Sequence, residues 1–200
     1  GFYTGSTESE VEKQFADLRD VHNADEFVAY LDTVIANRFT DDYFEYSLPA
    51  ELNSSSATSP AWYGYVAAIN VLGTPMLFRT APLSQSFVLG TSGDKNSVDK
   101  HHIFPKHYLE EIGYDNDRDR NQIANFTYLD YATNIDISDA PPAEYVCRYR
   151  DKLGEEGYKL VCAQNALPEN FEQLSYPDFL NQRRLLMSQI VKKAYNELNK

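Results

Sequence analysis

Apolar residues in the first forty positions recur every three or four residues, which is the spacing of one face of an amphipathic helix. These apolar residues form two groups, and each group is preceded by a helix-capping pattern. The first pattern is Thr7 to Glu10 and the second is Asn23 to Glu26. The sequence therefore predicts one helix over 8–19 and a second that ends near Asn37, together forming a helical hairpin. The apolar positions are Val11, Phe15 and Leu18, then Phe27, Leu31, Val34 and Ile35.

The next predicted helix opens at Ser59-Pro60, because proline is favoured at the first helical position, and Gly73 is placed to end it. Its buried side is predicted to consist of Trp62, Val66, Ile69 and Leu72. The pattern over 41–52 is ambiguous. The small polar residues of 53–58 indicate a surface loop.

Residues 123–129 are rich in β-forming side chains, and we expect a strand there that the chain enters through Asn125. The flanking segments are predicted to be a connection over Gly90–Ser97, a short helix over 106–112, a polar loop over Tyr114–Asn121 and a helix over 130–135. This middle part of the chain, 95–147, therefore mixes short strands with short helices.

The last third of the chain, 148–200, is predicted to be helical. One helix starts at Pro141-Pro142 and a long one opens at Pro177-Asp178. The long helix has apolar residues at helical spacing and carries four basic residues on its other faces, Arg183, Arg184, Lys192 and Lys193. We interpret these four as a solvated face in preference to a phosphate-contacting one.

The chain has 200 residues, of which 42% are hydrophobic and 24% charged, enough for one substantial core or two small ones. No apolar run is long enough for a membrane span and nothing at the start resembles a signal peptide, so we expect a soluble cytoplasmic protein. Because the chain opens with Gly1-Phe2-Tyr3 and no initiator methionine, we expect a piece of a longer protein.

The net charge of -12 argues at first against nucleic acid, which is held largely by lysine and arginine. The acidity is mostly N-terminal: residues 1–94 carry four basic and thirteen acidic side chains, 95–147 carry five and ten, and 148–200 carry nine and seven. A polyanion would therefore have to be held by local basic groups or by a further domain.

Three of the four histidines fall within one short window, at positions 101, 102 and 107. Hydrolysis of a phosphodiester needs a divalent metal ion and a neutral base, and adjacent residues on a strand point to opposite sides. His101 is thus a candidate metal ligand and His102 a candidate base. An asparagine oxygen suits Mg²⁺ or Mn²⁺, and Asn134 follows Asn125 by nine residues, an interval that fits a strand running into a helix.

The string His101-His102-Ile103-Phe104-Pro105-Lys106, followed by Ile123-Ala124-Asn125-Phe126 and Thr133-Asn134-Ile135, resembles the ββα-metal fold of HNH endonucleases. The continuation from Ile137 to Tyr145 resembles one branch of that family, the modification-dependent restriction proteins of the GmrSD type and their phage-defence relatives. The segment from Tyr3 to Glu10 is similar to the one that links the NTPase-like domain of such proteins to the nuclease motif.

The resemblance implies a mainly α fold, of the α+β class, with a small ββα-metal (HNH) motif embedded in it. Residues 1–94 would be a helical linker and support region, 95–147 the nuclease core, and 148–200 helices packed on that core. The expected partners are DNA and an N-terminal NTPase-like domain or subunit. No membrane is expected among them. The expected role is restriction or antiviral defence.

The resemblance also assigns roles to residues. His102 matches the general base, His101 and Asn134 match the ligands of one divalent ion, Mg²⁺ or Mn²⁺, and Asn125 matches the asparagine that braces the loop and orients the base. Lys106 and Lys100 are candidate substrate contacts. The implied reaction is single-metal hydrolysis of DNA that leaves 5′-phosphate and 3′-hydroxyl ends.

One position departs from the family pattern, and two alternatives stay open. Where relatives often place a basic residue after the helix asparagine, this chain has Ile135 and Asp136, which puts DNA affinity in doubt. The alternatives are a catalytically weak DNA-sensing or protein-interaction module, and an RNase or toxin-like nuclease with the same site. His107, one turn into a helix, is expected to be a surface residue, and His22 is given no role.

Overall fold

The computed structural model describes residues 6–80, 82–84 and 98–200, and the predicted connection over Gly90–Ser97 lies outside them. In the first half the elements are α1 (Thr7–Asp17), η1 (Leu18–Asp20), α2 (Ala24–Arg38), η2 (Tyr43–Ser47), α3 (Leu48–Glu51) and α4 (Pro60–Val71). In the second half they are β1 (Val98–His102), α5 (Lys106–Glu111), α6 (Asp117–Arg120), η4 (Ile123–Asn125), β2 (Phe126–Asp130), α7 (Tyr131–Ile137), α8 (Pro142–Gln164), η5 (Phe171–Gln173) and α9 (Tyr176–Leu198). The described part is mainly helical with a small two-stranded antiparallel sheet, as predicted.

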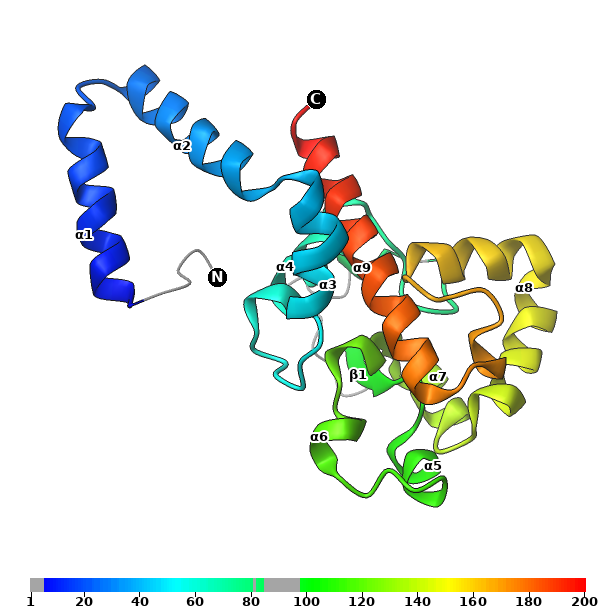
Figure 1. The fold of residues 1–200 in the computed structure, drawn as a ribbon. Helices are drawn as coiled ribbons and strands as arrows, with labels where there is room; N and C mark the ends of the chain where they lie inside the picture. Colours follow the sequence, from blue (N-terminus) through cyan, green and yellow to red (C-terminus); the bar gives the residue numbers. More distant parts are fainter. Residues whose placement is uncertain (1–5, 81, 85–97) are drawn as a thin grey trace.

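Helices α1 and α2 form close to their predicted positions and together make an arm that extends from the body (Figure 1). The predicted cap at Thr7 does not form, because Ser6 precedes α1 and its side chain makes no capping hydrogen bond. The Asn23 side chain accepts a hydrogen bond from the Glu26 N–H, which caps α2. No residue of either helix is buried, and Phe15 keeps 67% of its surface exposed. Helical spacing therefore located both helices and did not reveal that their apolar faces are only partly covered within the described chain.

The support for the rest of the fold is the pair α4 and α9, which pack along each other. Helix α4 starts at Pro60 as predicted, and Gly73 follows its end with a positive φ of 62°, a conformation that glycine adopts without strain. The ambiguous stretch 41–52 is helical, because η2 and α3 also pack against α9. The Ser188 hydroxyl donates to the Phe44 carbonyl and joins α9 to this region.

The two strands run antiparallel, with His101 opposite Thr127 and His102 opposite Phe126. The strand predicted over 123–129 begins three residues later, at Phe126. Its expected first residues form the turn η4, because the backbone there makes other bonds: the Ile123 N–H donates to the Ser54 carbonyl at 2.8 Å. Helix α7 follows β2 directly, so strand, strand and helix meet in one small unit.

The connection between the strands is better ordered than the predicted polar loop over 114–121. Residues Asp117–Arg120 form the short helix α6, whose Asn116 cap accepts from the Arg118 N–H. Arg120 is buried and forms ion pairs with Glu110 of α5 and with Asp117. The ion pair with α5 gives this short helix a stability that its own sequence does not provide.

Helices α8 and α9 pack on the strand–helix unit, and this packing overturns the predicted solvated face of α9 for two of its four basic residues, while Lys193 is exposed as predicted. Arg183 is 0% exposed, and its Nη1 donates to the Ala124 carbonyl at 2.8 Å. Arg184 is half-buried and donates to the Gln122 side chain at 3.1 Å. Both side chains lie between α9 and the turn that leads into β2, so neither is solvated as predicted. Helix α8 bends at Gly154, where φ is 70°.

One hydrophobic core cluster runs through all three predicted regions. It includes Leu48 and Trp62 from the first, Ile103 and Leu129 from the second, and Phe179 from the third. The middle region is therefore packed into the helical body and shares its core. None of the described helices is both long enough and apolar enough to cross a lipid bilayer.

The ion pair of Arg79 with Asp130 gives a prediction on stability. Asp130 caps α7 through the Thr133 N–H, and Arg79 donates to both carboxylate oxygens at 2.7 and 2.8 Å. The Arg79 and Thr133 hydrogen bonds hold the pKa of Asp130 well below its usual range. The stabilisation is complete above the unfolded pKa of about 3.9 and is lost as the pH falls below it.

We expect Arg79→Ala to lower the free energy of unfolding by roughly 1 kcal/mol at pH 7, because the half-exposed guanidinium is screened by solvent. The loss should be smaller at a pH near 2.5, and urea titrations at the two pH values measure it. Lys200→Ala, which removes an exposed pair with Glu197, is the control and should cost less. An equal loss for Arg79→Ala at both pH values would contradict the role given to Asp130.

Candidate functional site

His101 and Asn134 meet between strand and helix. The Nδ1 atom of His101 lies 2.7 Å from Oδ1 of Asn134, although 33 residues separate them. His101 is 9% exposed and lies on the side of β1 that faces α7. Successive side chains of a strand point to opposite sides, so the next residue, His102, points away from α7. The Asp130 cap fixes the start of α7, so Asn134 falls in its first turn. The structure thus brings together the two residues predicted as metal ligands.

His102 lies on the opposite side of β1, where it contacts the ring of Phe126 and the side-chain amide of Asn121. Its Nε2 atom lies 3.0 Å from Oδ1 of Asn121, and its imidazole meets the Phe126 ring edge to face at a centroid distance of 4.9 Å. Burial lowers the pKa of His102 to about 4, the Asn121 contact opposes this shift, and the nearby cations Lys106 and Lys100 add to it. The imidazole is therefore neutral at physiological pH, as a general base must be.

Asn125 is fully buried and clamps the backbone just beyond His102. Its Oδ1 accepts from the Phe104 N–H at 2.8 Å, and its Nδ2 donates to the carbonyls of Phe104 at 3.0 Å and Arg120 at 3.3 Å. These bonds brace the loop, which is half of the role that the sequence predicts for Asn125. The side-chain contact with the His102 ring comes from Asn121.

Asn121 is the residue that sequence reasoning missed. It ends α6, and its N–H donates to the Asp117 carbonyl at 2.9 Å. Its sequence context is a run of alternating aspartate, arginine and asparagine, which offers nothing to single out one amide. Only the folding of α6 against α5 and α9 brings this side chain to His102. The Tyr176 hydroxyl of α9 secures that fold by donating to the Asp119 carbonyl at 2.9 Å.

The two lysines predicted to contact substrate flank His102. Lys100 Nζ lies 4.4 Å from the centroid of the Phe126 ring, and Lys106 Nζ lies 3.5 Å from the Asp117 carboxylate. Both are exposed. His107 is also exposed and lies 3.4 Å from the Glu111 carboxylate within α5, in agreement with the expectation of a surface residue. His22 lies exposed between η1 and α2.

His101 Nδ1 donates a hydrogen bond to Asn134 Oδ1 in this structure, because an amide oxygen can only accept. With the ring proton moved to Nε2, the same two atoms would offer one nitrogen and one oxygen to a divalent ion that keeps most of its water. Two adjacent ligands of an octahedral Mg²⁺ at about 2.1 Å lie about 3 Å apart, close to the observed 2.7 Å between the two atoms. Within the described residues no group of three or more His, Cys, Asp or Glu side chains is arranged to hold a metal ion. One nitrogen and one oxygen suit Mg²⁺ or Mn²⁺ better than a closed zinc site.

Asp136 does not leave an uncompensated negative charge beside the site. The Tyr149 hydroxyl donates to its carboxylate at 2.8 Å, Arg148 lies 3.4 Å away, and Lys152 lies 3.9 Å away. The Tyr149 hydrogen bond and the two cations lower the pKa of Asp136. The acidic residue that departs from the family pattern is therefore matched by two cations of α8.

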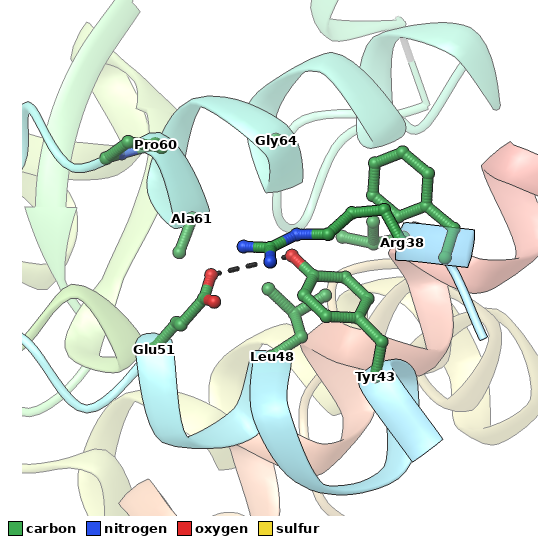
Figure 2. A pocket seen from close by; sticks show the side chains of 9 residues that line it. Arg38, Tyr43, Leu48, Glu51, Pro60, Ala61 and Gly64 are labelled. Carbon is green, nitrogen blue, oxygen red and sulfur yellow. Dashed lines mark hydrogen bonds between the residues drawn. The ribbon is translucent and has the colours of Figure 1, made fainter. Parts of the chain in front are cut away.

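A separate cavity of about 250 Å³ lies where α2 joins the body (Figure 2). Its walls are mostly apolar, and Figure 2 shows Arg38, Tyr43 and Glu51 near one another at its edge, with the Tyr43 hydroxyl 3.5 Å from the Glu51 carboxylate. Burial and the Glu51 charge raise the pKa of Tyr43 to about 12, so its hydroxyl stays protonated. None of the lining residues belongs to β1, β2 or α7, so the cavity is not part of the candidate site.

Comparisons of this chain with protein-family models, with curated proteins and with solved structures found no match. The candidate site therefore rests on its own geometry and on the sequence motif.

The Asn125 clamp predicts a large loss of stability. We expect Asn125→Ala to lower the free energy of unfolding by roughly 3 kcal/mol, because it leaves buried backbone groups of Phe104 without partners. Asn116→Ala removes an exposed helix cap instead and should cost about 1 kcal/mol. Urea unfolding of both variants measures the difference, and similar losses for the two would show that Asn125 is not a clamp.

Proposed function

We propose that this chain is the HNH endonuclease part of a defence protein and that it hydrolyses DNA phosphodiester bonds with a divalent metal ion. The observation that carries the proposal is the placement of His101 2.7 Å from Asn134 on one side of β1, with the next residue, His102, held by Asn121 and Phe126. The candidate ligand His101 and the candidate base therefore belong to one short stretch of chain at the end of β1.

In this mechanism each side chain has a separate task. His102 takes a proton from the water that attacks phosphorus. His101 and Asn134 would hold one Mg²⁺ or Mn²⁺, which when bound stabilises negative charge on the leaving oxygen. Lys100 and Lys106 attract the phosphate, and Asn125 keeps the loop beyond His102 in place. The charge balance around Asp136 supports DNA as a substrate in spite of the acidic chain.

The exposed arm supports a partner for the nuclease. Helices α1 and α2 keep Phe15, Phe27 and Val28 largely exposed, and surfaces of this kind mark protein contacts. This favours a larger assembly in which an NTPase-like domain or subunit contacts the arm. The protein-interaction module is therefore the second candidate function. Measured cleavage of nucleic acid by the chain would show that interaction is not its only role.

A plasmid-nicking assay with Mg²⁺ or Mn²⁺ tests the nuclease. His102→Ala should reduce the cleavage rate by roughly 10²- to 10⁴-fold, because it removes the general base. His107→Ala is the matched control, since this exposed histidine lies in the same window and pairs with Glu111, and it should leave the rate unchanged. Cleavage by His102→Ala at the rate of the unsubstituted chain would reject the assignment.

The nature of the nucleic acid is tested in the same assay with RNA and DNA of matched sequence. Faster cleavage of DNA is expected, and preferential cleavage of RNA would support the RNase alternative. No cleavage of either substrate, with the chain folded and metal present, would favour the interaction module.

Metal removal should separate activity from folding. We expect EDTA to abolish cleavage and to lower the melting temperature by no more than a few degrees, because a weakly held ion contributes about 1 kcal/mol or less. The hydrophobic core and the direct His101–Asn134 contact hold the fold without it. Thermal unfolding with and without EDTA measures this, and a drop of tens of degrees would indicate a structural metal instead.

A further inference from the structure

A histidine acts as a base through one ring nitrogen only, and the hydrogen bond of the other nitrogen selects which one it is. His102 has such a bond, because its Nε2 atom faces the Asn121 oxygen at 3.0 Å. An amide oxygen accepts hydrogen bonds and cannot donate them, so this contact places the ring proton on Nε2. The lone pair is then on Nδ1.

The His102 ring is fixed from two directions. The edge-to-face contact with Phe126 restricts the plane of the ring, and the Asn121 contact restricts its rotation. Asn121 itself is held by its backbone bond to Asp117 and by the fold of α6, which Arg120 and Tyr176 tie to α5 and α9. The acceptor therefore belongs to a braced turn.

The three asparagines near the histidines serve different ends. Asn134 faces His101, Asn125 clamps backbone, and Asn121 is the one whose side chain touches the His102 ring. A side chain that only supported the fold would not need to meet the imidazole at a ring nitrogen. The contact between Nε2 of His102 and Oδ1 of Asn121 determines which ring nitrogen of His102 carries the proton.

We propose, on the basis of the proposed nuclease function, that Asn121 is the positioning residue that holds His102 in the Nε2–H tautomer and aims Nδ1 at the attacking water. In the reaction Nδ1 accepts one proton from water while the water oxygen forms a bond to phosphorus. The bond from phosphorus to the leaving oxygen breaks, and that oxygen keeps the electron pair and takes a proton from solvent. The Nε2–H bond to Asn121 is kept throughout.

The test uses variants of the full 200-residue chain that keep or remove the hydrogen-bond acceptor at position 121. Asn121→Leu removes the oxygen at similar size, Asn121→Ala removes it without added bulk should leucine not fold, and Asn121→Asp keeps an oxygen at the same place. Asn116→Ala perturbs the start of α6 without touching His102 and serves as the control. Two readouts are compared: steady-state cleavage of plasmid DNA, and the tautomer of His102 by ¹⁵N NMR of the metal-free chain.

Loss of the acceptor should lower kcat by roughly 10- to 100-fold, the usual effect of removing a group that orients a histidine, and should leave KM for DNA unchanged. The Nε2–H tautomer should dominate in the unsubstituted chain and in Asn121→Asp and lose its dominance in Asn121→Leu. Asn116→Ala should keep both the rate and the tautomer.

The failures of the two proposals can be told apart. If the unsubstituted chain cleaves DNA and Asn121→Leu keeps both kcat and the tautomer, the positioning role is wrong and the nuclease stands. A dominant Nδ1–H tautomer in the unsubstituted chain would also overturn it. If the unsubstituted chain cleaves nothing, the proposed function falls, and the catalytic role of Asn121 falls with it.

Discussion

The backbone at the exit of β1 is the point on which the candidate site depends. Asn125 binds the N–H and the carbonyl of Phe104 with its side chain, and its own carbonyl accepts from the Ile103 N–H at 2.8 Å. These hydrogen bonds are fully buried, and a buried donor or acceptor that loses its partner destabilises the fold because water cannot replace that partner. They fix the direction in which the chain leaves His102, and therefore the place of everything that follows in the loop.

The helical body holds the same point from outside. The Tyr145 hydroxyl of α8 donates to the Ile103 carbonyl at 2.7 Å, and Arg183 of α9 donates to the Ala124 carbonyl at 2.8 Å. Arg183 is fully buried, an arrangement that costs free energy and places a guanidinium against the carbonyl of Ala124, the residue before Asn125. Helices α8 and α9 thus help to position a strand, a turn and a short helix.

Much of this arrangement was readable from the sequence, for physical reasons that differ between elements. The Asn23 cap and the Ser59-Pro60 start act locally, so α2 and α4 were located well, and α1 was located by its apolar spacing although its predicted cap does not form. The histidine pair and the interval from Asn125 to Asn134 also reflect local geometry, and the structure places His101 beside Asn134. Features set by tertiary packing were not readable.

Three residues show where the sequence was insufficient. Arg183 sits in a run of basic residues typical of a solvated face, and its burial follows from the docking of α9. Asn121 reaches His102 only because α6 folds against α5, and four polar residues alone do not predict a helix. Phe15 lies on a well-formed apolar stripe, yet periodicity does not say whether a stripe is covered.

The central claim is that His101 and Asn134 hold a metal ion beside the base. The most direct measurement is a crystal structure of the chain soaked in Mn²⁺, with anomalous scattering used to locate the ion. The account predicts one ion within bonding distance of His101 Nδ1 and Asn134 Oδ1, with water completing its coordination. Manganese bound elsewhere, or an unchanged His101–Asn134 hydrogen bond at saturating Mn²⁺, would contradict it.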